Sequence, residues 1–168
     1  MSDLTINISR LSEGIHQYSF EAEPENLSLD ERFVKPILVQ AALEKTSRQM
    51  FLRCELRTMG LFTCDRCLTD FDQEVSAHFE IMYMTQEGNV RQENEEEVQF
   101  LSPDTNVLDL GEDVRQFLVL AVPQKLLCRE DCEGLCPKCG ANRNKIRCDC
   151  SMNEIDPRWE VLRKMSSN

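Results

Sequence analysis

Apolar and polar residues alternate along much of the first half of the chain. In "QMFLRCELRT" (49–58) every second residue from Met50 to Leu56 is apolar, and the residues between them are mostly charged. "FDQEVSAHFEIMY" (71–83) alternates in the same way. Because successive side chains of a strand point to opposite faces, this period of two predicts two strands, each with one buried face.

Three shorter stretches also predict strands, namely "LTINIS" (4–9), "HQYSFEA" (16–22) and "PILVQAAL" (36–43). "SEGIH" (12–16) predicts the turn of an opening hairpin between the first two of them. The sequence therefore predicts an α+β fold whose residues 1–105 form an antiparallel β-rich body.

One helix is predicted after this body, in the segment 106–127. In "LDLGEDVRQFLVLAVP" (108–123), Asp109 is the expected N-cap and Glu112 completes a capping-box pattern, while Pro123 ends the helix. The apolar stripe that would pack on the sheet consists of Leu110, Val114, Phe117, Leu118 and Ala121. The remaining residues, 128–168, form a cysteine-rich tail, in which "DPRWEVLRKM" (156–165) predicts a short closing helix with Trp159 packed down.

Composition narrows the class of protein. The chain has 168 residues, 41% of them hydrophobic, and contains no apolar run of the roughly 18–20 residues that a membrane helix needs. "MSDLTINISR" has neither the basic start nor the apolar core of a secretory signal, so we expect a cytoplasmic protein without a membrane partner. The formal net charge is −11, yet residues 125–147 carry six basic side chains against three acidic ones. The acidic stretch 86–97 predicts a solvated loop, with docking of a basic partner as the alternative.

Nine cysteines are the most informative feature of the sequence. In a reducing compartment clustered cysteines indicate metal or redox chemistry before structural disulfides. Cys54 lies on the apolar face of its predicted strand and is interpreted as a buried, inert thiol. The other eight form four close pairs, Cys64 with Cys67, Cys128 with Cys132, Cys136 with Cys139, and Cys148 with Cys150.

Zinc is the metal that these pairs favour, because four thiolates in a tetrahedron suit it best. Cys136, Cys139, Cys148 and Cys150 can close one local site, and Gly140 allows the positive φ of a knuckle. By elimination, Cys64, Cys67, Cys128 and Cys132 would form a second site. The number of zinc ions per chain, one or two, is left open by the sequence. An iron–sulfur cluster fits four thiolates as well, but the form "CPKCG" favours zinc.

Catalysis is not expected. A thiol–disulfide enzyme needs its cysteine pair at the start of a helix, and neither "CDRC" nor "CPKCG" leads into one. His78 is interpreted as a surface histidine, and the chain has no glycine-rich phosphate loop. Zinc sites filled by four cysteines leave no open position for a small-molecule substrate. The basic side chains around the local site are the candidate contacts to RNA phosphates: Lys138, Arg143, Lys145 and Arg147.

The ordered set "CDRCL", "LDLGEDVRQFLVLAVPQKLLC", "CEGLCPKCGANRN", "CDC" and "DPRWEVL" resembles the YceD family, the large ribosomal RNA subunit accumulation proteins of bacteria and plastids. The resemblance implies a non-catalytic factor in the synthesis, processing or stability of 23S ribosomal RNA. Its implied partner is that RNA or a pre-ribosomal particle, reached directly or through a basic ribosomal protein. A zinc-stabilised protein–protein adaptor, or a thiol redox switch without RNA contact, is the alternative.

Overall fold

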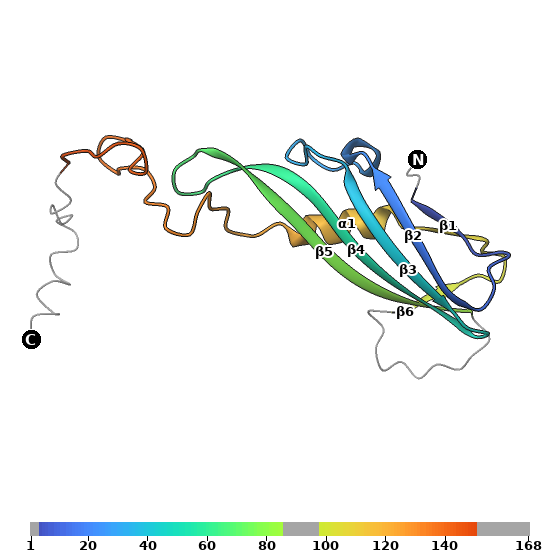
Figure 1. The fold of residues 1–168 in the computed structure, drawn as a ribbon. Helices are drawn as coiled ribbons and strands as arrows, with labels where there is room; N and C mark the ends of the chain where they lie inside the picture. Colours follow the sequence, from blue (N-terminus) through green and yellow to red (C-terminus); the bar gives the residue numbers. More distant parts are fainter. Residues whose placement is uncertain (1–3, 86–97, 151–168) are drawn as a thin grey trace, which may run out of the picture. The chain divides into compact units, whose positions relative to one another are not determined.

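The computed structural model describes residues 4–85 and 98–150, which belong to two compact units (Figure 1). We name the first the β unit; it consists of Met1–Phe62 and Asp70–Leu126. The second, the cysteine unit, consists of Thr63–Thr69 and the chain from Leu127 onward. The turn with the first cysteine pair therefore belongs to the same unit as the cysteine-rich segment after the helix.

A five-stranded sheet forms the body of the β unit. Its strands, in their order across the sheet, are β2 (Gly14–Ala22), β3 (Ile37–Lys45), β4 (Gln49–Thr63), β5 (Asp70–Thr85) and β6 (Val98–Leu101). The alternating stretches 49–58 and 71–83 lie in β4 and β5, so the prediction of strands there is confirmed. The expected sheet is antiparallel throughout, whereas β6 runs parallel to β5. Alternation reports which face of a strand is buried and not the direction of its neighbour, which is why this edge was not predicted.

The predicted opening hairpin is wrong. β1 (Thr5–Asn7) pairs with β7 (Val107–Asp109) in a separate two-stranded sheet, and β2 pairs with β3. Gly14 to His16, the expected turn, already belong to β2. The cause is burial: Ile6 and Leu108 face each other across the small sheet and are both buried in the core.

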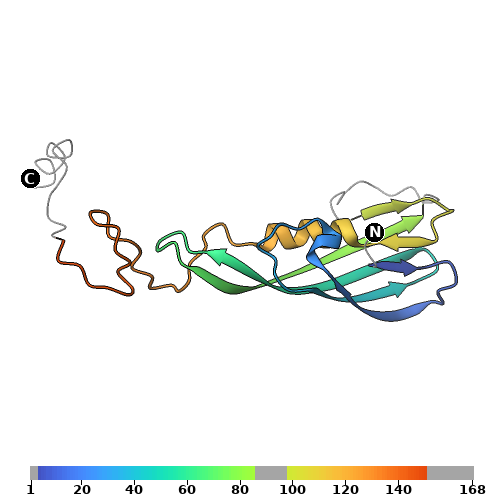
Figure 2. The same cartoon turned by 90° about the horizontal axis from the view of Figure 1, so that it is seen from above.

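The helix α1 (Gly111–Ala121) covers one face of the five-stranded sheet, as Figure 2 shows from above. Val114 and Leu118 of the expected stripe are fully buried, and the Phe117 ring stacks on Phe79 of β5 with centroids 4.6 Å apart. The stripe is therefore confirmed as the packing face. Pro123 follows the helix at its expected end.

The start of the helix differs from the predicted capping box. Leu110 is the N-cap residue and makes no side-chain capping bond. Asp109 is instead the last residue of β7, where its Oδ1 accepts a hydrogen bond from Gly111 N over 2.9 Å. Glu112 does not reach back to the cap, because its carboxylate accepts hydrogen bonds from Arg115 and Gln116.

Three further elements were not predicted from the sequence, namely β6, β7 and a 3-10 turn, η1 (Pro24–Leu27). The acidic stretch 86–97, the expected closing helix at 156–165 and Trp159 all lie outside the described residues. Within the described ranges, no helix is long and apolar enough to cross a membrane.

Candidate metal centres

The first cysteine pair is presented by the turn that joins β4 to β5. Cys64 N donates to the carbonyl of Thr69 over 3.0 Å, and Leu68 N donates to the carbonyl of Cys64 over 2.9 Å. Leu68 closes the turn with a left-handed φ of 53°. These bonds hold Cys64 and Cys67 on one tight loop, and both thiols are buried.

The chain that follows α1 brings the second pair to this turn. Arg66 connects the two segments: its guanidinium donates to the carbonyl of Cys132 over 2.9 Å, and its own carbonyl accepts a hydrogen bond from Leu135 N over 3.0 Å. Cys132 N also donates to the carbonyl of Arg129. Segments more than sixty residues apart in sequence are therefore fixed side by side within the cysteine unit.

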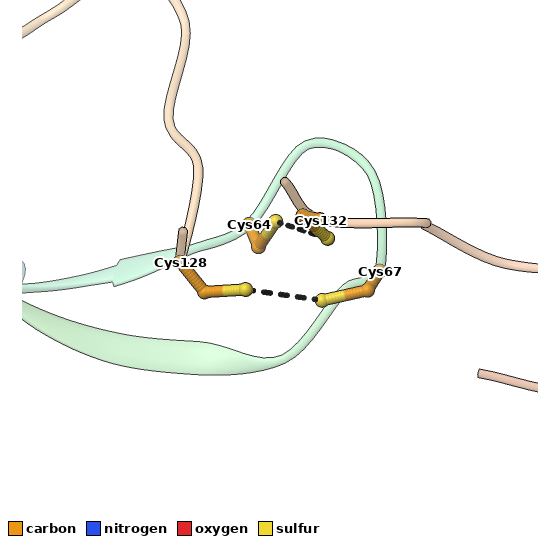
Figure 3. A group of neighbouring side chains, drawn as sticks. All are labelled: Cys64, Cys67, Cys128 and Cys132. Atoms are coloured by element: carbon orange, nitrogen blue, oxygen red, sulfur yellow. Dashed lines mark hydrogen bonds between the residues drawn. The ribbon is translucent and has the colours of Figure 1, made fainter. Parts of the chain in front are cut away.

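We name the resulting cluster of Cys64, Cys67, Cys128 and Cys132 the hairpin group (Figure 3). The sulfur of Cys64 lies 3.7 Å from that of Cys132, and the sulfur of Cys67 lies 3.6 Å from that of Cys128. All four sulfur atoms lie within 4.8 Å of one another. A tetrahedral zinc ion with bonds of about 2.3 Å separates its sulfur ligands by about 3.8 Å. The donor set therefore fits such an ion in number, type and spacing.

The local group, Cys136, Cys139, Cys148 and Cys150, converges in the same way, again with all sulfur atoms within 4.8 Å. Cys136 N donates to the carbonyl of Ala141, and Gly140 N donates to the carbonyl of Cys136, each over 2.8 Å. Gly140 has a φ of 72°, so the positive φ expected there is confirmed. The structure thus brings together both predicted sets of four, the local one inferred from spacing and the other by elimination, while occupancy by zinc remains a prediction.

Backbone amides prepare one thiol of each group for ionisation. Burial raises the pKa of Cys64, but hydrogen bonds from the backbone of Cys128, Cys67 and Arg66 outweigh it and lower the pKa to about 6. Backbone hydrogen bonds from Cys139 and Lys138 likewise lower the pKa of Cys136 to about 6. A thiolate is the form that binds metal, so these amides favour a bound cation.

A second thiol in each group shows that ionisation is disfavoured where several sulfurs share a site without a positive charge. Burial, followed by its neighbouring sulfurs, raises the pKa of Cys128. The sulfur of Cys139 is the largest cause that raises the pKa of Cys150. Four thiolates cannot lie this close together unless a cation compensates them, and a divalent ion at the centre would supply that charge.

Two asparagines that sequence reasoning missed connect the groups. Asn142 Nδ2 donates to Thr69 Oγ1 over 3.2 Å, and Asn144 Nδ2 donates to the sulfur of Cys132 over 3.3 Å. Both residues lie in the loop between Cys139 and Cys148. Their only signal in the sequence is this position between two candidate ligand pairs.

The four candidate phosphate contacts all have exposed side chains: Lys138, Arg143, Lys145 and Arg147. Arg143 Nε lies 3.9 Å from a carboxylate oxygen of Glu133, so part of its charge is compensated within the unit. Arg129, which was not a candidate, forms an ion pair with Asp131 over 3.3 Å. The structure places all four basic residues on the surface of the cysteine unit.

Two residues outside the groups behave as the sequence indicated. Cys54 is buried in the core of the β unit, where burial and the nearby Asp113 carboxylate raise the pKa of its thiol to about 12. It is therefore an inert core residue. His78 is exposed on the polar face of β5.

A β-rich fold joined to a unit with two sets of four converging thiols defines a protein with two candidate metal centres. The family model described as "Large ribosomal RNA subunit accumulation protein YceD" matches residues 52–166, and the chain belongs to this family. The matched range contains all eight cysteines of the two groups.

Curated relatives are similar to the chain, and one of them carries the family description in its name. The chloroplastic "Large ribosomal RNA subunit accumulation protein YCED homolog 1" of Arabidopsis thaliana is 24% identical over 153 residues, which cover 76% of this chain and 47% of the relative. "Uncharacterized protein YlbN" of Bacillus subtilis is 24% identical over 146 residues, 85% of this chain and 81% of the relative. An "Uncharacterized protein" of Mycobacterium tuberculosis is 31% identical over 106 residues, 61% of this chain and 48% of the relative. The chain thus spans about half the length of the plant and mycobacterial relatives. No solved structure matches it significantly.

Proposed function

We propose that this protein is a non-catalytic, zinc-stabilised factor that supports the synthesis, processing or stability of 23S ribosomal RNA. The observation that carries the proposal is membership of a family described by large ribosomal RNA subunit accumulation. The chloroplastic relative carries the same description in its name. Thiolate sites need reduced cysteines. This requirement agrees with a protein that acts in the cytoplasm, where thiols are kept reduced.

The donor sets support a structural rather than a catalytic role for the metal. A catalytic zinc keeps one coordination position for water or substrate, whereas a structural zinc is closed by four protein ligands. Each group offers four thiols whose sulfur atoms lie within 4.8 Å of one another, close enough for one ion to bind all four. The hairpin group joins Cys64 and Cys67 to the segment after α1, and the local group closes a loop within that segment, so metal in both would fix the fold of the cysteine unit.

The zinc part is tested by the metal content of the full chain, purified without added zinc. We expect two zinc ions per chain, one after Cys136→Ser and one after Cys64→Ser. Cys54→Ala is the matched control, because it removes a cysteine outside both groups and keeps two ions. A wild-type chain that carries no metal would refute this part of the proposal.

Direct contact with RNA is proposed through Lys138, Arg143, Lys145 and Arg147. The test is a salt titration of binding to a large-subunit ribosomal RNA fragment. For a single-stranded site, each phosphate that a basic side chain neutralises contributes about 0.7 to the slope of log K against log salt. Lys145→Ala with Arg147→Ala should therefore flatten the slope by about 1.4.

The matched control is Arg10→Ala with Arg48→Ala, which removes two exposed arginines of the β unit and the same total charge. It should leave the salt slope unchanged. Equal effects of the two double variants would show that only overall charge matters. Binding that appears only when a basic ribosomal protein is added would favour the protein–protein adaptor instead.

A further inference from the structure

The loop between Cys139 and Cys148 is closed by one cysteine group and bonded to the other. Its ends are ligand candidates of the local group, while its asparagine side chains point to the hairpin group. Asn144 Nδ2 lies 3.3 Å from the sulfur of Cys132, and Asn142 Nδ2 lies 3.2 Å from Thr69 Oγ1, next to the turn that carries Cys67. A single short segment therefore contacts both candidate centres.

Both the oxygen and the nitrogen of the Asn144 carboxamide make hydrogen bonds. Its Oδ1 accepts a hydrogen bond from Glu133 N over 2.9 Å and another from the Arg129 guanidinium over 2.6 Å. With the oxygen engaged by two donors, the nitrogen is the atom that faces the sulfur of Cys132. The side chain thus accepts from the backbone amide that follows Cys132 and from the Arg129 side chain, and it donates to the sulfur of Cys132.

The two ends of this loop, Cys139 and Cys148, meet in the local group. Asn142 pairs with Leu135 in an isolated bridge, and Arg143 N donates to the carbonyl of Gly134 over 3.0 Å. These two bonds hold the first part of the loop, and its second part runs on to Cys148 of the local group. A metal ion that joins Cys136 and Cys139 to Cys148 and Cys150 closes the loop and removes the entropic cost of holding it.

An N–H donor to a metal-bound thiolate has a defined effect. Four thiolates around a divalent cation leave excess negative charge on sulfur, and a hydrogen bond to one sulfur disperses it. Outer partners of this kind typically contribute a factor of 10 to 100 in metal affinity. We infer that Asn144 couples the two centres, so that metal in the local group raises the affinity of the hairpin group for its own ion. This inference rests on the proposed zinc binding.

The coupling is tested by zinc affinity, measured on the full chain by competition with a chromophoric chelator. Cys136→Ser with Cys139→Ser empties the local group, and we expect the affinity of the hairpin group to fall about tenfold or more. Asn144→Ala alone should weaken the hairpin group by a similar factor. Asn144→Ala in the emptied background should add little, because the same hydrogen bond is already broken.

Asn144→Asp tests the role of the side chain as a donor separately from its role as an acceptor. The aspartate keeps an oxygen for Glu133 N and Arg129, but it places a second oxygen where the donor was. It should weaken the hairpin group at least as much as Asn144→Ala does. Ile146→Ala, two residues further along the same loop and 62% exposed, should leave the affinity unchanged.

The outcomes distinguish the coupling from the zinc binding on which it rests. Two ions bound with unchanged affinities in Asn144→Ala would overturn the coupling and leave zinc binding intact. A wild-type chain that binds no zinc would overturn both. Far-ultraviolet circular dichroism of each variant checks that the β unit stays folded, so that a reduced affinity is not the result of unfolding.

Discussion

Gly134 lies directly against the backbone of Arg66. A Cβ atom at Gly134 would be 3.0 Å from the Arg66 carbonyl oxygen, and this oxygen already accepts the hydrogen bond from Leu135 N. Arg66 lies between Cys64 and Cys67. The close approach therefore brings the segment that joins Cys132 to Cys136 into contact with the turn of the hairpin group.

Gly134→Ala should weaken metal binding by the hairpin group more than Gly140→Ala does. Both glycines have positive φ, 73° and 72°, so alanine costs roughly 1–2 kcal/mol of backbone strain at either position. Only at Gly134 must the Arg66 carbonyl also move, since a Cβ at Gly140 meets nothing within 4 Å. Chelator competition measures the difference. Equal reductions in the two variants would show that backbone strain alone is responsible.

Gly60→Ala should destabilise the β unit by about 1–3 kcal/mol, because it overpacks a filled core. A Cβ at Gly60 would lie 2.3 Å from Cε2 of Phe62, whose ring is buried edge-on against Phe33. The free energy of unfolding from urea titration gives the measurement. Adding Phe62→Leu removes the clashing ring atoms, so the double variant should be destabilised by less than the sum of the two single effects. Strict additivity would contradict the clash.

Leu118→Ala should cost about 2–5 kcal/mol of stability, since Leu118 is fully buried between α1 and the sheet. Leu120 lies two residues further along the same helix and is 78% exposed. Leu120→Ala is therefore the matched control and should change the free energy of unfolding by less than about 0.5 kcal/mol. A large destabilisation in Leu120→Ala would mean that this side chain is covered in solution.

The strands with strict alternation could be predicted because a period of two is a local signal. The partner of β1 could not, since β7 has only three residues and its Leu108 and Asp109 were interpreted as the approach to the helix. Pairing between Ile6 and Leu108 depends on the burial of both in the finished core. Pairing across such a distance leaves no pattern in either stretch.

The cysteine groups show the same limit at the candidate site. The local group lies within fifteen residues, so its spacing was enough to group it. The hairpin group joins pairs that are sixty-one and sixty-eight residues apart and was reached only by elimination. Asn144 was missed because a carboxamide in a loop shows no chemistry until its neighbour, the sulfur of Cys132, is known.

Asp113→Asn should raise the melting temperature at pH 7. Burial, followed by the charges of Glu112 and Asp109, raises the pKa of Asp113 in spite of a hydrogen bond from Gln99. A carboxylate with a raised pKa costs stability when it is ionised; this cost is full above its folded pKa and disappears as the pH falls from there toward the ordinary value of 3.8. The gap between the variant and the wild type should therefore close on acidification. Thermal unfolding of both proteins at each pH tests this, and a constant gap would contradict it.

Glu112→Gln should have the opposite pH dependence. Hydrogen bonds from Arg115 and Gln116 lower the pKa of Glu112 to about 2, below the ordinary value of 4.5. Its contribution to stability is therefore present above pH 4.5 and disappears as the pH falls toward 2. The variant should melt slightly below the wild type at pH 7, because the side chain is exposed, and should approach it in acid. Acid would also release metal from the thiols of both proteins. Comparing the two melting temperatures at the same pH removes this shared effect from their difference. A variant that melts above the wild type at pH 7 would show that these hydrogen bonds do not stabilise the first turn of α1.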